Sequence, residues 1–179
     1  MAIIEIEDKK FETLIKETEI RAAIDIVAAR LNLELDGKRP LFVCVLNGAF
    51  MFAADLMRRL TIDCQISFMK VASYEGTNSS GRVKQLIGLN EEVKGRTVVL
   101  IEDIVDTGET MVMLTKQLKD LGAADVRIAT LLFKPESCRK DVTPNYIGIN
   151  LPKDFIVGYG LDYNGYGRNL TDIYSLVKD

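Results

Sequence analysis

Apolar residues recur at intervals of three and four positions early in the chain, with polar residues between them. The apolar positions are Ile20, Ala23, Ile24, Val27, Ala28 and Leu31. This spacing predicts an amphipathic helix, and Thr18 is available as its N-cap. A second helix is expected to begin at Gly48 and to run to about residue 60. A third is expected over residues 110–121, where Gly122 ends the pattern.

Strand-like segments alternate with these helices. Residues 40–46, 97–103 and 126–133 each contain a continuous apolar run, which is typical of a strand buried on both faces. Residues 62–68 alternate between apolar and polar side chains, the pattern of a half-buried strand, and residues 83–88 form a further candidate strand. The alternation predicts an α/β fold with a mainly parallel central sheet, which binds ligands at the carboxyl ends of its strands.

The composition limits the chemistry that this chain can perform. Its 179 residues contain no repeat or linker, so we expect one domain over residues 1–179. Histidine is absent, which excludes imidazole catalysis and leaves carboxylates, Lys, Arg and backbone amides. The formal net charge of −3 argues against nucleic acid or an anionic membrane as a partner.

The cysteines and the apolar segments bear on where the protein works. Cys44, Cys64 and Cys138 are widely spaced and odd in number, which favours reduced thiols over a disulfide framework. Residues 1–10 contain no apolar signal core, and the apolar stretch 41–57 is interrupted by polar residues. We therefore expect a cytoplasmic protein.

Residues 98–111 carry the most specific pattern in the chain. A buried strand ends in Glu102 and Asp103, and the turn 106–110 follows immediately before a helix. Backbone amides and hydroxyls at a helix N-terminus can bind a phosphate group without any lysine. The two upstream carboxylates can accept hydrogen bonds from vicinal hydroxyls or face magnesium through water. Together these groups suit a ribose 5-phosphate.

A simpler interpretation is a strand whose polar turn merely caps the next helix. A lone acidic pair or a lone Asp-Thr-Gly would support no more than that. In this chain all the elements occur together and in order, which favours the phosphate site. The sequence contains neither a GxxxxGK[ST] phosphate loop nor a GxGxxG dinucleotide fingerprint after a strand.

The segment IEDIVDTGETM resembles the phosphoribosyl pyrophosphate signature of type I phosphoribosyltransferases, specifically of their hypoxanthine-guanine branch. LNGAFMFAADL, the Ser-Tyr-led loop, LLFKPES and DFIVGYGLDYNGYGRNL follow that family's order over nearly the whole chain. The resemblance implies the type I phosphoribosyltransferase fold, which is a mainly parallel central sheet with flanking helices and a small hood.

The resemblance also assigns roles to the residues around the phosphate turn. Glu102 and Asp103 would hold the ribose hydroxyls. The 5-phosphate would be held by Asp106, Thr107, Gly108, Glu109 and Thr110. Asp106 would also accept a proton from the purine ring, a role that suits a chain without histidine.

Three further residues would bind the purine. Lys134 would donate to the 6-oxo group, Phe155 would stack on the ring, and the backbone of Ile156 would meet the base edge. Without the resemblance, Lys134 could be a solvated loop lysine and Phe155 a core residue.

The magnesium, pyrophosphate and lid sites are implied in the same way. Asp162 resembles the aspartate that faces both magnesium and the purine, and Glu102 and Asp103 would complete the metal site. Arg168, Asn47 and Gly48 would bind pyrophosphate. Asp162 and Arg168 could otherwise belong to an ordinary polar turn. Ser73 and Tyr74 begin a polar loop that would close over the reacting centre.

Two residues depart from the family pattern. Asn47 stands where relatives often have Lys or Arg, so backbone amides rather than a charged side chain would meet pyrophosphate there. Glu109 also stands where many relatives are basic. An acid beside a phosphate is unfavourable, so we expect Glu109 to face solvent.

The implied activity is transfer of the 5-phosphoribosyl group from phosphoribosyl pyrophosphate to hypoxanthine and guanine, with magnesium, in a homodimer or homotetramer. A preference for xanthine stays open, because these bases differ only at position two. The same fold could also belong to a relative that has lost catalysis or to an RNA-binding regulator. Retention of Asp106, Lys134 and Asp162 argues against lost catalysis, and the acidic charge balance argues against RNA binding.

Overall fold

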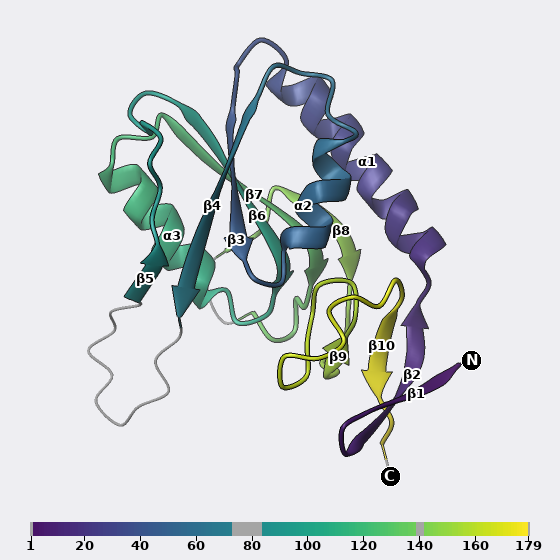
Figure 1. The fold of residues 1–179 in the computed structure, drawn as a ribbon. Coiled ribbons are helices and arrows are strands. Elements are labelled where there is room, and N and C mark those ends of the chain that lie inside the picture. Colours follow the sequence, from purple (N-terminus) through teal and green to yellow (C-terminus); the bar gives the residue numbers. More distant parts are fainter. Residues whose placement is uncertain (1, 73–83, 139–141, 179) are drawn as a thin grey trace.

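The computed structural model describes residues 2–72, 84–138 and 142–178, which form ten strands and three helices in these ranges (Figure 1). The first half contains β1 (Ile3–Ile6), β2 (Lys9–Ile15), α1 (Glu17–Leu35), β3 (Leu41–Leu46), α2 (Phe50–Met57), β4 (Gln65–Ala72) and β5 (Lys84–Ile87). The second half contains β6 (Thr97–Val105), α3 (Glu109–Asp120), β7 (Asp125–Phe133), β8 (Tyr146–Asn150), β9 (Ile156–Val157) and β10 (Ile173–Leu176).

The main sheet has the strand order β5-β4-β3-β6-β7-β8. All neighbouring pairs from β4 to β8 are parallel, and β5 joins the edge in the antiparallel direction. The predicted α/β class and mainly parallel sheet are therefore confirmed. Because the strands are parallel, the segments that follow β3, β6 and β7 meet at one edge of the sheet (Figure 1).

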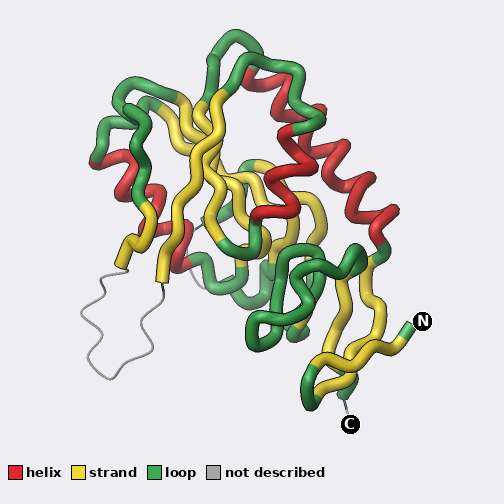
Figure 2. Tube along the Cα trace, viewed as in Figure 1, coloured by secondary structure: helices red, strands yellow, loops and turns green. Residues whose placement is uncertain are grey.

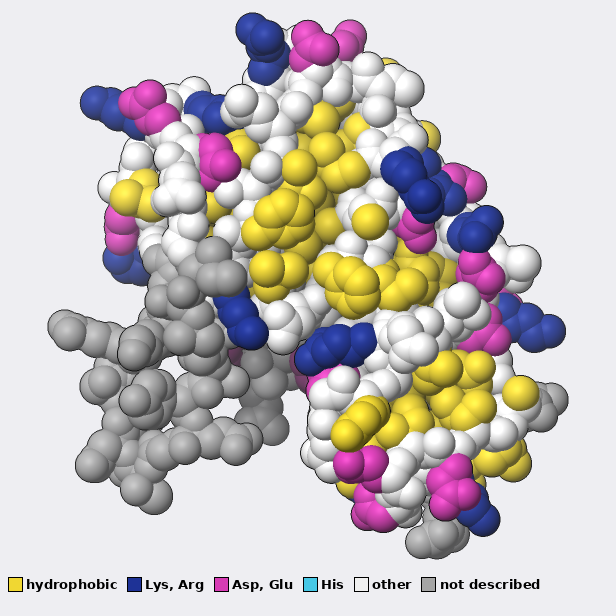
Figure 3. Space-filling model, in the orientation of Figure 1, with side chains coloured by type: hydrophobic (Ala, Val, Ile, Leu, Met, Phe, Trp, Pro, Cys, Tyr) yellow, Lys and Arg dark blue, Asp and Glu magenta, His cyan; other side chains and the backbone are white. Residues whose placement is uncertain are grey.

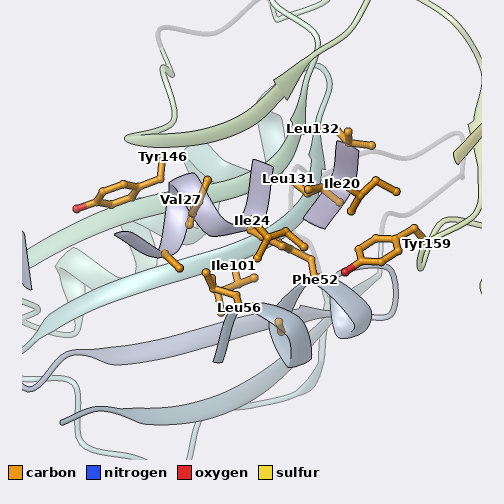
Figure 4. Packing of buried hydrophobic residues seen from close by; sticks show 14 of the residues in the cluster. Ile20, Ile24, Val27, Phe52, Leu56, Ile101, Leu131, Leu132, Tyr146 and Tyr159 are labelled. Carbon is orange, nitrogen blue, oxygen red and sulfur yellow. The ribbon is translucent and has the colours of Figure 1, made fainter. Parts of the chain in front are cut away.

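The apolar runs form strands because they supply both faces of the sheet. Phe42 and Cys44 of β3 belong to the core cluster beneath α1 and α2, which Figure 4 shows from close by. Leu41, Val43 and Val45 belong to a second cluster, which packs against α3. Alternate side chains of one strand thus enter opposite layers, as the pleat requires. A continuous apolar sequence is the natural consequence.

A second, smaller sheet has the order β1-β2-β10-β9 and is antiparallel throughout. It lies beyond the carboxyl ends of the main strands (Figure 1), and Figure 2 shows loops gathered in the region between the two sheets. Phe11, Val157 and Tyr174 form its own small core. This sheet corresponds to the expected hood, although the N-terminal strands themselves were not predicted.

Two details of the helices differ from the sequence-based prediction. Thr18 is not the N-cap, because α1 begins one residue earlier and Lys16 occupies the cap without a side-chain hydrogen bond. The carboxylate of Asp172 accepts from the Glu17 amide at 2.8 Å instead, so a distant residue satisfies this helix end. Helix α2 is shorter than predicted and ends at Met57. Within the described ranges, no helix has the length and apolarity needed to cross a membrane.

Candidate active site

The turn between β6 and α3 lies at the carboxyl edge of the main sheet. Gly108 caps α3 with a φ of +80°, a left-handed conformation that favours glycine. The turn, together with Glu102 and the first residues of α3, lines a small cavity of about 110 Å³. Glu109 is exposed, as expected. The predicted phosphate residues therefore surround one small space at a helix N-terminus, where the helix dipole favours an anion.

Lys134 lies at the end of β7 with its side chain directed into the structure. Its relative exposure is only 8%, so it is not a solvated loop lysine. The ammonium Nζ lies 3.2 Å from Asp106 Oδ2 and donates to the Asp154 carbonyl oxygen at 2.8 Å. The Lys134 amide also donates to the Val105 carbonyl at 3.0 Å. The ends of β6 and β7 thus bring together a carboxylate and an ammonium that are 28 residues apart.

Glu102 and Asp103 are carboxylates in an environment that opposes ionisation. Burial, the charge of Asp103 and a hydrogen bond to it raise the pKa of Glu102 well above its usual value. Oxygen Oε2 of Glu102 is buried and has no hydrogen-bond partner among the described residues. Burial also raises the pKa of Asp103 to about 6, although the Ile104 amide donates to its carboxylate at 2.8 Å.

The loop after β3 packs directly against Asp103. The Leu46–Asn47 peptide bond is cis, and Gly48 follows it. A Cβ atom at Gly48 would lie 1.5 Å from Asp103 Oδ2, so no larger residue fits without displacing that carboxylate. A Cβ atom at Gly160, whose φ is +99°, would lie 2.1 Å from the Gly48 carbonyl oxygen. Asp103, Gly48 and Gly160 therefore form one close stack from three separate segments.

The segment 158–168 adds a charged pair beside this stack. Arg168 Nη2 lies 2.6 Å from Asp162 Oδ1, and Nη1 donates to the Gly160 carbonyl at 2.7 Å. The second oxygen of Asp162 accepts from the Gly165 amide at 2.7 Å. The Arg168 charge lowers the pKa of Asp103 and the Asp162 charge raises it, although burial is the largest influence. Both predicted residues are therefore close enough to Asp103 to act on it electrostatically.

Phe155 is half-exposed in the loop that enters β9, at 47% relative exposure. Its ring meets Tyr163 edge-on, with 5.9 Å between ring centroids. The preceding residue, Asp154, holds Lys134 through its carbonyl, so Phe155 follows directly on a residue that contacts the lysine. Ile156 is buried and pairs with Ser175 of β10.

Three contributors to this region were not predicted from the sequence. They are the Asp154 carbonyl, the close approach of Gly160 to Gly48, and Tyr159, whose hydroxyl donates to the Asp55 carboxylate. The glycines of Gly158-Tyr159-Gly160 indicate left-handed backbone, but nothing in the sequence pattern identifies which segments they contact. The predicted lid residues Ser73 and Tyr74 lie outside the described residues.

Comparisons with known proteins agree with this arrangement. A family model described as "Phosphoribosyl transferase domain" matches residues 12–164. A hypoxanthine-guanine phosphoribosyltransferase of Lactococcus lactis is 41% identical over 165 residues, covering 91% of this chain and 90% of that protein. A crystal structure of a hypoxanthine phosphoribosyltransferase from Staphylococcus aureus has a TM-score of 0.88 at 36% identity, covering 93% of this chain and 91% of that chain.

One further relative has a different organisation. The bifunctional protein TilS/HprT of Listeria monocytogenes is 42% identical over 163 residues, which are 90% of this chain. The match covers 25% of that protein, so the chain spans about a quarter of its length. Because the family model matches most of this chain and the Lactococcus relative matches nearly its full length, the chain belongs to the phosphoribosyl transferase domain family.

Proposed function

We propose that this protein transfers the 5-phosphoribosyl group of phosphoribosyl pyrophosphate to hypoxanthine or guanine, giving IMP or GMP and pyrophosphate in purine salvage. The observation that carries this proposal is the buried Lys134 ammonium beside Asp106, at the end of the phosphate-binding turn. The Lactococcus relative, named for this activity, supports the same assignment.

The hydrogen-bonding capacity of Lys134 supports a 6-oxopurine. An ammonium carries three N–H donors and no acceptor. Asp106 and the Asp154 carbonyl accept hydrogen bonds from two of these N–H groups, which leaves one N–H group for a substrate atom. The 6-oxo group of hypoxanthine or guanine can accept it, whereas the 6-amino group of adenine offers a donor. Sites built on such polar matching can discriminate by roughly four to five orders of magnitude.

The transfer itself needs one proton acceptor. A purine ring nitrogen forms a bond to C1′ of the ribose as the bond from C1′ to the pyrophosphate oxygen breaks. Pyrophosphate leaves with that electron pair, and the proton that the purine loses passes to the Asp106 carboxylate. About half of the Asp106 side chain is exposed, so a substrate can reach it. Lys134 holds the carboxylate in place through the contact between its ammonium and Asp106 Oδ2.

Phe155 and Ile156 complete the base site in this proposal. Phe155 offers a partly exposed ring for stacking, and the Ile156 backbone meets the base edge. The turn from Asp106 to Thr110 holds the 5-phosphate. Glu102 and Asp103 accept from the ribose hydroxyls, a role that fits a buried carboxylate oxygen without a protein donor.

Magnesium fits the acidic groups of the site. Carboxylate oxygens are the ligands that this ion prefers, and the partnerless Oε2 of Glu102 lies beside Asp103. Across the parts of the chain that the structure describes, no three potential ligands converge, and magnesium commonly takes its remaining ligands from phosphates and water. Glu102, Asp103 and Asp162 would hold it through water and substrate oxygens as well as directly, rather than as three converging ligands. A bound ion would supply positive charge that neutralises the phosphates of the leaving pyrophosphate.

Pyrophosphate would meet the loop at Asn47 and Gly48 on one side and Arg168 on the other. Arg168 supplies the positive charge that Asn47 cannot. The close contact between Gly48 and Gly160 keeps these two sides together.

Self-association as a homodimer or homotetramer is part of the proposal. Figure 3 shows hydrophobic side chains gathered over the region of α2 and β4. Phe50 and Phe68 are large apolar residues exposed by 42% and 44% in these segments. Exposed apolar patches of this kind commonly mark protein interfaces. Light scattering on the purified protein tests this part, and a monomer would contradict it.

The direct test of the activity supplies phosphoribosyl pyrophosphate and magnesium with one purine at a time. Hypoxanthine and guanine should give nucleotide and pyrophosphate, and adenine should give almost none. The rate with xanthine shows how strongly the substituent at position two of the purine affects the choice of base. In Lys134→Ala, use of the oxopurines should fall much more than binding of phosphoribosyl pyrophosphate. Equal turnover of adenine and hypoxanthine by the native protein would refute the role of Lys134.

A further inference from the structure

Tyr159 joins the segment 158–168 to helix α2. The residue is buried, with 3% relative exposure, and its φ of +48° is unusual for a residue other than glycine. Its hydroxyl donates to the Asp55 carboxylate of α2. Figure 4 shows the Tyr159 ring reaching toward Phe52, which also belongs to α2. A residue held in a left-handed conformation is maintained by its surroundings, and such residues concentrate at functional sites.

The partner of this hydroxyl is a charged acceptor. Burial opposes ionisation of Asp55, but the Tyr159 hydroxyl and Arg58 together outweigh it and lower the pKa of that carboxyl group. Burial and the Asp55 carboxylate raise the pKa of Tyr159, so its hydroxyl keeps its proton at neutral pH. A hydrogen bond from a neutral hydroxyl to a carboxylate belongs to the stronger class in proteins.

The two ends of this bond belong to segments that meet at the site. Helix α2 begins directly after the loop that contains Gly48, and Tyr159 directly precedes Gly160. The Tyr159 amide donates to the Leu170 carbonyl at 2.9 Å, and the Gly160 amide donates to the Arg168 carbonyl at 2.9 Å. The tyrosine is therefore fixed to the backbone that carries Arg168, and its hydroxyl is fixed to the helix behind the Gly48 loop.

We propose that Tyr159 is a positioning residue for pyrophosphate binding. By donating to Asp55, it holds the segment 158–168 against the loop at Gly48, so that Arg168 and that loop face pyrophosphate from fixed positions. The proposal rests on the proposed function. In this role, Tyr159 and Asp55 act on pyrophosphate binding without contacting the substrate themselves.

The variant Tyr159→Phe removes the hydroxyl and keeps the ring in the core. The KM for phosphoribosyl pyrophosphate should rise on the order of tenfold, the lower end of what a charged hydrogen bond contributes. The KM for hypoxanthine should stay within about twofold, because Lys134 and Phe155 are held by other contacts. A purely structural role would lower the melting temperature without separating the two KM values.

Tyr146→Phe is the matched control. Tyr146 is also fully buried, and its hydroxyl accepts from Arg127 at 2.7 Å and donates to Glu34 at 2.8 Å. Figure 4 shows Tyr146 and Tyr159 at opposite ends of the labelled cluster. Removing its hydroxyl should also lower stability, yet both KM values should stay unchanged. If the two variants raise the KM for phosphoribosyl pyrophosphate equally, the effect comes from stability and the proposal is wrong.

A double-mutant cycle tests whether the two side chains act together. Asp55→Ala and the double variant Asp55→Ala/Tyr159→Phe should raise the KM for phosphoribosyl pyrophosphate to nearly the same extent as Tyr159→Phe alone. Effects that multiply across the two sites would show independent roles and would overturn the positioning pair.

Failure of this inference can be separated from failure of the proposed function. If the native protein forms nucleotide and Tyr159→Phe keeps its KM for phosphoribosyl pyrophosphate, only the positioning role is refuted. If the native protein forms none, hydrogen exchange decides instead. Amides in residues 158–168 should then exchange faster in Tyr159→Phe than in Tyr146→Phe, and equal rates would refute the holding contact itself.

Discussion

Replacing Gly160 with alanine tests the contact between the segment 158–168 and the Gly48 loop. Gly160 has a φ of +99°, and a Cβ atom there would lie 2.1 Å from the Gly48 carbonyl oxygen. Gly37 offers a matched control, because its φ is +74° and a Cβ atom there would meet nothing within 4 Å. Both substitutions carry the conformational penalty of a left-handed alanine, but only Gly160→Ala adds a collision with backbone.

The structure sets the size of the two effects. A left-handed alanine costs about 1–2 kcal/mol, which is the whole effect expected for Gly37→Ala. Relieving the Gly160 contact to 3.0 Å, the closest approach that a Cβ atom tolerates, requires a shift of about 0.9 Å. Overpacking of this kind adds roughly 1–3 kcal/mol, so Gly160→Ala should cost about 2–5 kcal/mol of unfolding free energy. A misplacement of about 1 Å at a site can also cost roughly a hundredfold in rate.

Urea denaturation measures the first effect, and kcat/KM for phosphoribosyl pyrophosphate measures the second. Gly37→Ala should keep its kcat/KM within about twofold, whereas Gly160→Ala should lose roughly a hundredfold. If Gly160→Ala matched Gly37→Ala in both measurements, the two loops would not be in contact as described, and the proposed pyrophosphate site between them would have no physical basis.

Three further predictions concern the acids of the site. Asp106→Asn keeps an acceptor for Lys134 but cannot take a proton, so turnover should fall about a hundredfold or more while the fold is retained. Near-normal steady-state turnover would contradict the proton transfer to Asp106. Asp162→Ala should raise the magnesium concentration needed for half-maximal rate, and an unchanged magnesium titration would remove Asp162 from the metal site. Burial raises the pKa of Asp103 from 3.8 to about 6. Between these pH values the folded protein keeps the Asp103 proton while the unfolded chain releases it. The free energy of unfolding should therefore fall by about 3 kcal/mol as the pH rises across this range. Urea denaturation from about pH 4 to about pH 8 measures this effect, and Asp103→Asn should remove it. If the free energy of unfolding depended on pH in the same way in variant and wild type, burial would not raise the pKa of Asp103.

The predictable parts of the site are those that lie together in the sequence. Strand β6, its two acids, the turn and helix α3 follow one another without interruption, so the order of residues 97–120 is also their order in space. Lys134 was predictable for a related reason, since the end of a parallel strand must lie at the same edge as the ends of its neighbours. The roles assigned to these residues come from the family resemblance and stay predictions.

Contacts between distant segments could not be predicted from periodicity. Tyr159 and Asp55 are 104 residues apart, and Glu17 and Asp172, which meet at the start of α1, are 155 apart. A repeat of 3.6 or 2 residues reports which side of an element is buried and carries no information about its neighbour. The hood strands β1 and β2 were missed because their half-exposed positions weaken the alternation that identifies a strand.

The acids at the end of β6 show where stability and function oppose each other. Glu102 and Asp103 both have a raised pKa, so each ionised carboxylate costs folding free energy in the protein alone. Nothing in the packing compensates for Oε2 of Glu102, which lacks a hydrogen-bond partner among the described residues. Hydroxyl groups or a cation that met these oxygens would offset the remaining cost, because both interactions favour the charged form. We expect a ligand that carries vicinal hydroxyl groups as well as a phosphate to stabilise the protein more strongly than phosphate alone, since the proposed phosphate site is only the turn before α3.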